Sequence, residues 1–146
     1  MPLGYPNQQS IMAIGTKSGT TYTGATLTAA YTDNLGRTIA TGGISKVSLY
    51  CVYTMGATET TNSVQIRTEF SPDATNWFQD TNEAISAGTS TLSVREYTHV
   101  GANAAARNFV LLIDDVADPY MRLAVKETGV VTNFGTCSLE VTLSGI

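Results

Sequence analysis

The sequence has few charged residues, only two cysteines and a single histidine, and it lacks long apolar runs. Lys, Arg, Asp and Glu make up 14% of the 146 residues, whereas soluble domains average roughly 25%. The eight basic residues are scattered singly, so the clustered charge that binds nucleic acid or an anionic membrane surface is missing. No segment reaches the length of a transmembrane helix. The composition therefore disfavours nucleic-acid and membrane partners.

The scarcity of metal ligands and nucleophiles limits the chemistry that the sequence can predict. Cys51 and Cys137 each lie in an apolar strand pattern, where buried free thiols are common. Their spacing leaves open whether they form a disulfide. With the lone His99 they supply too few ligands for a metal site. No Ser-His-Asp signature accompanies His99, so we expect a surface histidine, no cofactor and no enzymatic activity.

The chain also lacks a sustained helical stripe, and period-two alternation dominates instead. Residues 46–55 and 64–70 alternate, and their expected inward side chains are Val47, Leu49, Cys51, Tyr53, Met55, Val64, Ile66, Thr68 and Phe70. The last strand is expected to point Cys137, Leu139, Val141 and Leu143 inward. About eight strands separated by turn signals are typical of sandwiches and jelly rolls. We predict an all-β fold, a single-domain antiparallel β-sandwich or jelly roll over residues 16–146.

Three further segments carry weaker strand signals. Residues 25–31 are predicted as a strand with Leu27 and Ala29 inward, and residues 90–100 as one alternating strand. The continuous apolar run 108–113 has the pattern of a fully buried central strand.

The N-terminal segment 1–15 is predicted to be an extended arm. Its first ten residues hold two prolines, one glycine and no charged side chain, and they show neither helical nor strand periodicity. The short apolar run 11–14 has no basic residue before it, so we predict no signal peptide and synthesis in the host cytoplasm.

Two polar clusters invite a site interpretation. In residues 71–77, Pro72 presets a turn, Asp73 and Asn76 can bond backbone amides, and Trp77 re-enters as an aromatic lid. Ser71 begins this structural turn. A second cluster of three carboxylates could hold Ca²⁺ through oxygen ligands, but the spacing is not that of an EF-hand and ordinary turn chemistry is favoured; it comprises Asp114, Asp115 and Asp118.

The segment Val64 to Phe78, VQIRTEFSPDATNWF, resembles a hairpin of small β-rich virion proteins of tailed bacteriophages. In these proteins a strand leads into a turn similar to S-P-D-G-T-N-W, and the tryptophan starts the next strand. The whole chain resembles a phage head decoration protein, also called a cement or auxiliary capsid protein. Ala74 stands where glycine is usual, which predicts a turn that avoids the most strained geometry.

The resemblance implies a structural virion protein on the capsid exterior. It would bind the major capsid protein, stabilise the assembled shell and act as a homotrimer. A charge-poor surface suits such protein contacts. The arm residues expected to contact the capsid are Leu3, Tyr5, Gln8, Gln9 and Ile11.

The aromatic residues support an alternative function. Trp77 or an exposed tyrosine could stack on a sugar, as in a glycan-binding module of a phage tail or fibre that recognises the host surface. Many of the tyrosines, however, lie in strand patterns that predict packing between strands. A hydrolase is a third reading that no nucleophile and base arrangement supports.

Overall fold

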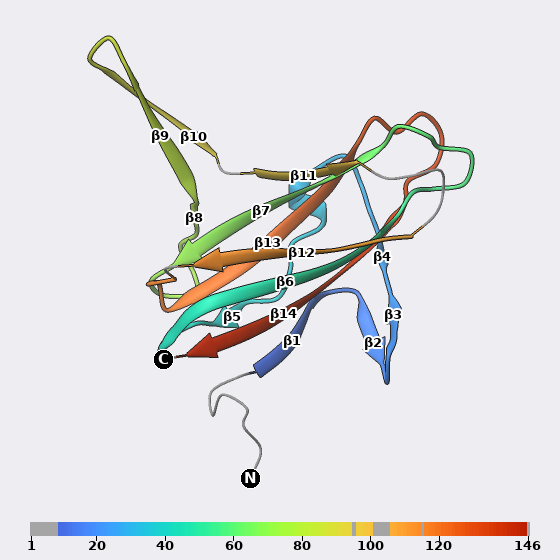
Figure 1. Cartoon of the computed structure of the whole chain (residues 1–146), viewed down its shortest axis with the longest axis horizontal. Coiled ribbons are helices and arrows are strands. Elements are labelled where there is room, and N and C mark those ends of the chain that lie inside the picture. The colour runs from blue at the N-terminus through green and yellow to red at the C-terminus, as the bar shows by residue number, and fades with distance from the viewer. Residues whose placement is uncertain (1–8, 95, 101–105, 115, 146) are drawn as a thin grey trace.

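The computed structural model describes residues 9–94, 96–100, 106–114 and 116–145. Two antiparallel sheets face each other (Figure 1), which confirms the predicted all-β sandwich. The first sheet has the order β1-β14-β6-β12, with β4 paired to β14. Its strands are β1 (Gln9–Ile14), β4 (Ala25–Thr26), β6 (Ile44–Thr54), β12 (Ala106–Asp114) and β14 (Thr136–Gly145).

The second sheet has the order β11-β7-β13-β5, with β8 paired to β7. Its strands are β5 (Ile39–Ala40), β7 (Ser63–Ser71), β8 (Phe78–Gln79), β11 (Glu96–Val100) and β13 (Tyr120–Thr128). Two hairpins form separate two-stranded sheets, and a short 3-10 helix joins β4 to β5. These elements are β2 (Thr16–Ser18), β3 (Thr21–Thr23), β9 (Thr81–Ser86), β10 (Thr89–Val94) and η1 (Tyr31–Asp33).

The core lies between the two sheets and is built by the alternating strands. In β6 and β14 every predicted inward residue is buried, from Val47 to Tyr53 and from Cys137 to Leu143. In β7 and β13 the buried side chains facing them are Val64, Ile66, Thr68, Met121, Leu123 and Val125. Each large apolar side chain removed from water contributes about 1.5–3 kcal/mol. The packing of β6 and β14 against β7 and β13 therefore supplies most of the stabilisation.

The apolar run 108–113 does not form the buried central strand that its composition predicts. It lies in β12, at one edge of the first sheet within the described residues. Ile113 faces the core, but Val110 is 49% and Leu112 is 69% exposed. An apolar run is the same whether one face or both faces are covered, so its sequence could not distinguish the two cases.

Two other predicted strands are broken up. Residues 90–100 belong to β10 and β11, which lie in different sheets, so the single predicted strand is wrong. In residues 25–31 only Ala25–Thr26 is strand. Leu27 is buried as predicted, but Ala29 is exposed because the chain turns into η1 instead of continuing in extended form.

The sandwich begins at Gln9 rather than at residue 16. β1 pairs with β14, with Gln9 opposite Leu143 and Ile11 opposite Val141. Ile11 packs against the core, so part of the predicted arm belongs to the sheet. Four apolar residues with one serine before them make a strand that this edge of the first sheet can accept. The other predicted arm contacts, Leu3, Tyr5 and Gln8, lie outside the described residues.

Candidate functional site

The most exposed apolar element of the described chain is the β9–β10 hairpin, which leaves the second sheet as an insertion. Phe78 pairs with Phe70 and Gln79 with Glu69, and the Asp80 N–H donates to the Thr68 carbonyl at 3.2 Å. Pairing along the same edge of β7 resumes at the next residue, where Arg67 pairs with Glu96 of β11. The chain therefore departs from a continuous ladder between residues 80 and 96, and Figure 1 shows the hairpin projecting away from the body.

The hairpin turn is a two-residue loop with both residues in the left-handed region. Ala87 has φ +50° and Gly88 has φ +77°, and Ser86 pairs with Thr89. Positive φ at both central positions matches the twist of a tight antiparallel ribbon. This Ala-Gly pair was the sequence signal for the hairpin, and it was missed because alanine is not one of the usual residues of that turn.

One face of the hairpin is apolar and open to solvent. Ile85 is opposite Ser90 and Leu92 is opposite Glu83, so all four side chains lie on the same face. Ile85 is 73% and Leu92 is 66% exposed. An isolated two-stranded ribbon is marginally stable in water. An exposed ribbon with a two-residue apolar patch would therefore be stabilised by packing against another surface.

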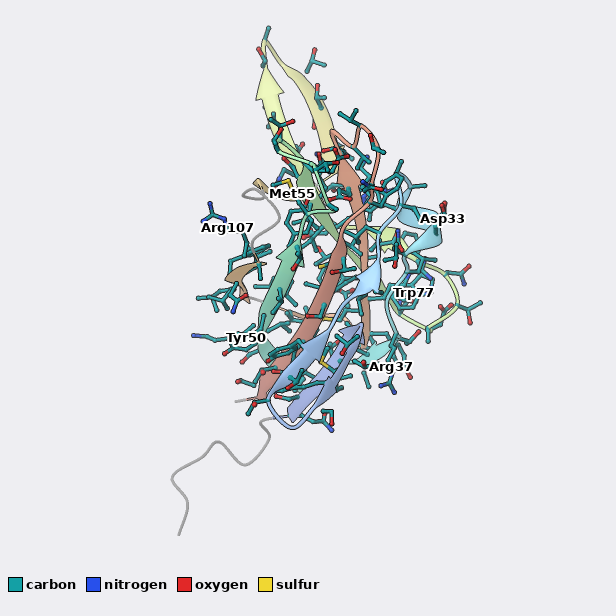
Figure 2. The ribbon with its side chains drawn as sticks, turned by 90° about the vertical axis from the view of Figure 1, so that its right-hand side faces the viewer. Asp33, Arg37, Tyr50, Met55, Trp77 and Arg107 are labelled. Atoms are coloured by element: carbon teal, nitrogen blue, oxygen red, sulfur yellow. The ribbon has the colours of Figure 1, made fainter. Side chains whose placement is uncertain are left out.

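A second exposed apolar surface lies on the outside of the first sheet at β6 and β12, and we call it the outer face. Tyr50 of β6 pairs directly with Val110 of β12, and Tyr50 is 43% exposed. Leu112 lies two residues further along the same side of β12. A groove crosses this surface, lined by Tyr22, Tyr50, Val52, Asn108, Phe109 and Val110. Figure 2 shows Tyr50 and Arg107 on one side of the molecule and Trp77 on the other.

Among the described residues, β12 forms one edge of the first sheet and pairs with β6 alone. Edge strands commonly carry a lysine, a proline or a bulge that prevents pairing with another chain. Between Asn108 and Ile113 the sequence is NFVLLI, and the pairing with β6 runs without a register shift. The exposed side chains of Val110 and Leu112 therefore lie on this edge strand.

In the predicted structural turn Asp73 accepts backbone amides as expected, whereas the Asn76 side chain bonds the Asp73 carboxylate and not a backbone amide. The Ser71 hydroxyl accepts the backbone N–H groups of Asp73 at 3.2 Å and Ala74 at 2.9 Å. Asp73 Oδ1 accepts the N–H of Asn76 at 2.8 Å, and the Asn76 side-chain amide donates to Asp73 Oδ2 at 2.7 Å. The bonds to the Asp73 carboxylate, led by that of the Asn76 N–H, stabilise its ionised form and hold the pKa of this carboxyl group well below its usual range.

Ala74 does not avoid the strained geometry, contrary to the sequence prediction. Its φ is +62°, in the left-handed region where a Cβ atom costs about 1–2 kcal/mol.

We expect Ala74→Gly to raise the free energy of unfolding by about 0.5–1 kcal/mol in urea denaturation, because glycine removes this strain at some cost in chain entropy. Ala30 has φ −122°, so Ala30→Gly should change stability in the opposite direction. Equal effects of both substitutions would contradict the strain at Ala74.

Trp77 lies half-buried beside the turn rather than as a free platform. The Arg122 guanidinium stands 4.4 Å from the centre of the Trp77 ring, and Arg122 Nε is 2.6 Å from Glu69 Oε1. Arg122 and Glu69 are direct neighbours across β13 and β7. One face of the indole is therefore covered by a cation that is itself held in place.

The far end of the sandwich holds a buried polar cluster that sequence reasoning missed. Glu127 is 1% exposed. Its Oε2 accepts the Tyr53 hydroxyl at 2.5 Å and the Asn62 amide at 3.5 Å, and its Oε1 accepts the Gly135 N–H at 2.7 Å. Burial and the hydrogen bond to Glu127 raise the pKa of the Tyr53 hydroxyl well above its ordinary value. The cluster ties the β13–β14 connection to β6, which is a structural role.

Glu59 also holds the β13–β14 connection through hydrogen bonds to its backbone. Glu59 is 4% exposed, and its Oε1 accepts the backbone N–H groups of Val131 at 2.6 Å, Thr132 at 3.0 Å and Asn133 at 3.3 Å. These bonds, led by that of Thr132, lower the pKa of the Glu59 carboxyl group against the opposing effect of burial. The anion is thus the form that holds the loop.

The two cysteines are buried free thiols, the state that the sequence favoured. Cys51 Sγ and Cys137 Sγ lie 3.4 Å apart, on neighbouring strands in diagonal register. The hydrogen bond to Cys137, together with burial, raises the pKa of the Cys51 thiol well above its usual value. A protonated buried pair of this kind is a poor nucleophile.

No further chemistry gathers in the part of the chain that the structure describes. Among the described residues no three His, Cys, Asp or Glu side chains come close enough to hold a metal ion. The carboxylate cluster can be followed only at Asp118, since Asp115 and the Asp114 side chain lie outside the described part, as does the His99 side chain. Within the same residues, no helix is long and apolar enough to cross a membrane.

The exposed apolar hairpin and the outer face are therefore the candidate functional surfaces. The comparisons with known proteins do not assign the chain to a family: no family model matches it, and no curated protein matches it.

Proposed function

We propose that this chain is a structural virion protein that binds the outer surface of an assembled viral capsid and stabilises it. One observation carries the proposal. A charge-poor β-sandwich presents apolar side chains on a projecting hairpin and on an open sheet face, namely Ile85, Leu92, Tyr50, Val110 and Leu112. Exposed apolar patches on a soluble domain mark contact sites for other proteins. The partner is the major capsid protein, and the protein acts without catalysis.

The fold suits this mechanical role. Two sheets that share one apolar core form a stiff body, so a protein with several contact surfaces can hold neighbouring capsid subunits at a fixed spacing. Binding only to the assembled shell shifts the equilibrium toward that shell by mass action. The resemblance of the segment from Val64 to Phe78 to phage decoration proteins supports the virion setting, with the protein made in the host cytoplasm and then placed on the capsid exterior as a homotrimer.

The proposal is tested by sedimenting the full chain with empty expanded capsids of the virus that encodes it. We expect the protein to sediment with the shells to a saturating ratio, and the shells to withstand a higher temperature. A variant lacking residues 1–8 keeps every described strand pairing, so it should fold as the full chain does and bind capsids less well. A full chain that stays in the supernatant at all concentrations would overturn the proposal.

One observation favours glycan binding as the second candidate. Tyr22 and Tyr50 line the groove on the outer face, and tyrosine rings in an open groove can stack on a sugar. Trp77 suits this role less, because Arg122 covers one face of its ring. Titration of host-surface glycans, followed by NMR of the Tyr50 ring, would show saturable shifts if this candidate is correct and no shifts if the groove is only a protein contact.

A further inference from the structure

We propose that the β2–β3 hairpin, residues 16–23, is a flap over the first sheet, and that the Glu140 carboxylate is the latch that holds the flap closed. Tyr22 of the flap lines the groove on the outer face, so the position of the flap decides which side chains this groove presents. The inference deepens the proposed function and rests on it only for the partner, the capsid. The flap itself is tested on the isolated protein.

One side chain of the first sheet holds both strands of the flap. Lys17 of β2 stands directly opposite Tyr22 of β3, so the two side chains lie on the same face of the hairpin. The Lys17 ammonium group donates to Glu140 Oε2 at 2.9 Å, and the Tyr22 hydroxyl donates to Glu140 Oε1 at 3.0 Å. A single carboxylate therefore binds a neighbouring pair of donors, one from each strand.

Glu140 lies on the outside of the sheet, beside the outer face. Its neighbours along β14, Leu139 and Val141, are buried in the core, so Glu140 points the other way. It pairs directly with Tyr50 of β6. The Glu140 side chain is only 12% exposed, and both of its carboxylate oxygens are bonded to the flap. Opening the flap would therefore uncover an anionic group next to Tyr50.

Little else holds the flap against the sheet. Among the described residues, no other side-chain hydrogen bond or ion pair joins residues 16–23 to β14 or β6. β2 and β3 pair only with each other, and every residue of β2 is exposed. A two-stranded hairpin without an apolar face is marginally stable in water. Losing the latch should therefore free the flap while the core, on the opposite side of β14, stays packed.

The base of the flap has the character of a hinge. The chain enters the flap at Gly15 and leaves it at Gly24. A Cβ atom at Gly15 would stand 2.6 Å from the Thr23 carbonyl oxygen, and one at Gly24 would stand 2.9 Å from the Cys137 nitrogen. Only glycine fits these two close approaches, and glycine also has the widest range of backbone angles. The flap can therefore rotate at its base while β1 and β4 keep their pairing with β14.

The closed and open flap present different chemistry to a partner. In the closed flap the Tyr22 ring forms a wall of the groove that Tyr50 and Val110 also line, and the Lys17 ammonium group lies 4.8 Å from the centre of that ring. The charges of Lys17 and Glu140 offset each other, so the groove stays aromatic and apolar. An open flap removes the Tyr22 wall and leaves the Glu140 anion unpaired. The closed flap thus suits the apolar contact proposed for the capsid.

Hydrogen exchange of the backbone amides, followed by NMR on the full chain, measures the opening of the flap. Glu140→Ala removes the acceptor of both flap donors, so the amides that pair β2 with β3 should exchange about fivefold or more faster. The amides of β6 and β13 should keep their rates. Glu69→Ala is the matched control, because it removes an ion pair of the same kind with Arg122 on the second sheet; it should leave exchange in the flap unchanged.

Two milder variants separate the halves of the latch. Tyr22→Phe removes only the hydroxyl group, and Lys17→Met removes the charge while keeping most of the side chain. Each should accelerate flap exchange less than Glu140→Ala does. Raising the salt concentration should accelerate it further in Tyr22→Phe but not in Lys17→Met, because salt screens only the ion pair. Flap exchange that Glu140→Ala does not change would overturn the inference, and so would equal acceleration in β6 and β14, which would mean that Glu140 holds the sheet.

Capsid binding separates this inference from the proposed function. On the capsid the flap amides should exchange more slowly than in solution, because a partner bound in the groove stabilises the closed flap. Unchanged flap exchange on the capsid would remove the flap from the contact. A chain with a flap that depends on Glu140 but with no affinity for capsids would retain the latch and remove the proposed function, and a chain that binds capsids although its flap ignores Glu140 would do the reverse.

Discussion

Replacing Gly135 with alanine is expected to lower the free energy of unfolding by about 3 kcal/mol or more, at the upper end of overpacking effects. A Cβ atom at this position would stand 2.1 Å from the Thr54 carbonyl oxygen and 3.0 Å from Glu127 Oε2. The first contact is with backbone at the end of β6, so a side-chain rotation cannot relieve it. The Gly135 N–H also donates to Glu127, and its carbonyl accepts the Leu27 N–H at 2.9 Å. Moving Gly135 away would break both bonds.

Urea denaturation followed by circular dichroism measures this effect. Gly42→Ala is the matched control, because a Cβ atom there meets nothing within 4 Å and the backbone is not in the left-handed region. The control should change stability by no more than about 1 kcal/mol, with stabilisation as the expected sign. If both alanine variants unfolded at the same urea concentration, the close approach of Gly135 to β6 would be wrong.

Removing the Glu127 carboxyl group should have an effect of similar size. Glu127→Ala leaves the buried Tyr53 hydroxyl and the Gly135 N–H without their acceptor and removes the longer bond from the Asn62 amide. Each unsatisfied buried group costs about 1–3 kcal/mol, and the lost side chain leaves a cavity besides. Partial relaxation offsets some of this cost, so we expect a loss of about 3–4 kcal/mol.

Glu127→Gln distinguishes the hydrogen bonds from the side-chain volume. Glutamine keeps the shape and one acceptor oxygen, but its amide group faces the Asn62 amide and must reverse the Tyr53 bond. We expect a loss of about 1–2 kcal/mol for glutamine. Glu140→Ala removes a partly exposed ion pair with Lys17 and the bond from the Tyr22 hydroxyl, so it should destabilise the protein much less than Glu127→Ala. An alanine variant at Glu127 as mild as Glu140→Ala would mean that the cluster does not hold the loop.

The parts of the fold that the sequence predicted are those where one face of a strand is buried and the other is wet. In β6 the buried apolar residues alternate with less buried ones, of which Lys46, Ser48 and Thr54 are polar, and this contrast specifies both the strand and its inward face. β12 gives no such contrast, because Phe109 to Ile113 are all apolar. Its place at the edge depends on which other strands are available to cover it, and that is a property of the whole chain.

The candidate surfaces were harder to predict than the turn. The bonds within Ser71 to Asn76 are local, so residue type and spacing determined them, but the sign of φ at Ala74 was missed because surrounding bonds outweigh its intrinsic preference. The hairpin depends on the ladder along β7 continuing past it, from Asp80 to Glu96. The Glu127 cluster joins residues 53, 62, 127 and 135, whose proximity no local pattern records.

The junction at the base of the hairpin allows the length of the inserted segment to vary. Because the chain leaves and rejoins β7 at adjacent positions, Thr68 and Arg67, the intervening segment is not needed to set the register of the second sheet. Sequences of other lengths and shapes could be grafted between Asp80 and Glu96 without altering the scaffold. This site would then serve to display a foreign peptide, and in nature it is where related chains would be expected to diverge in length first.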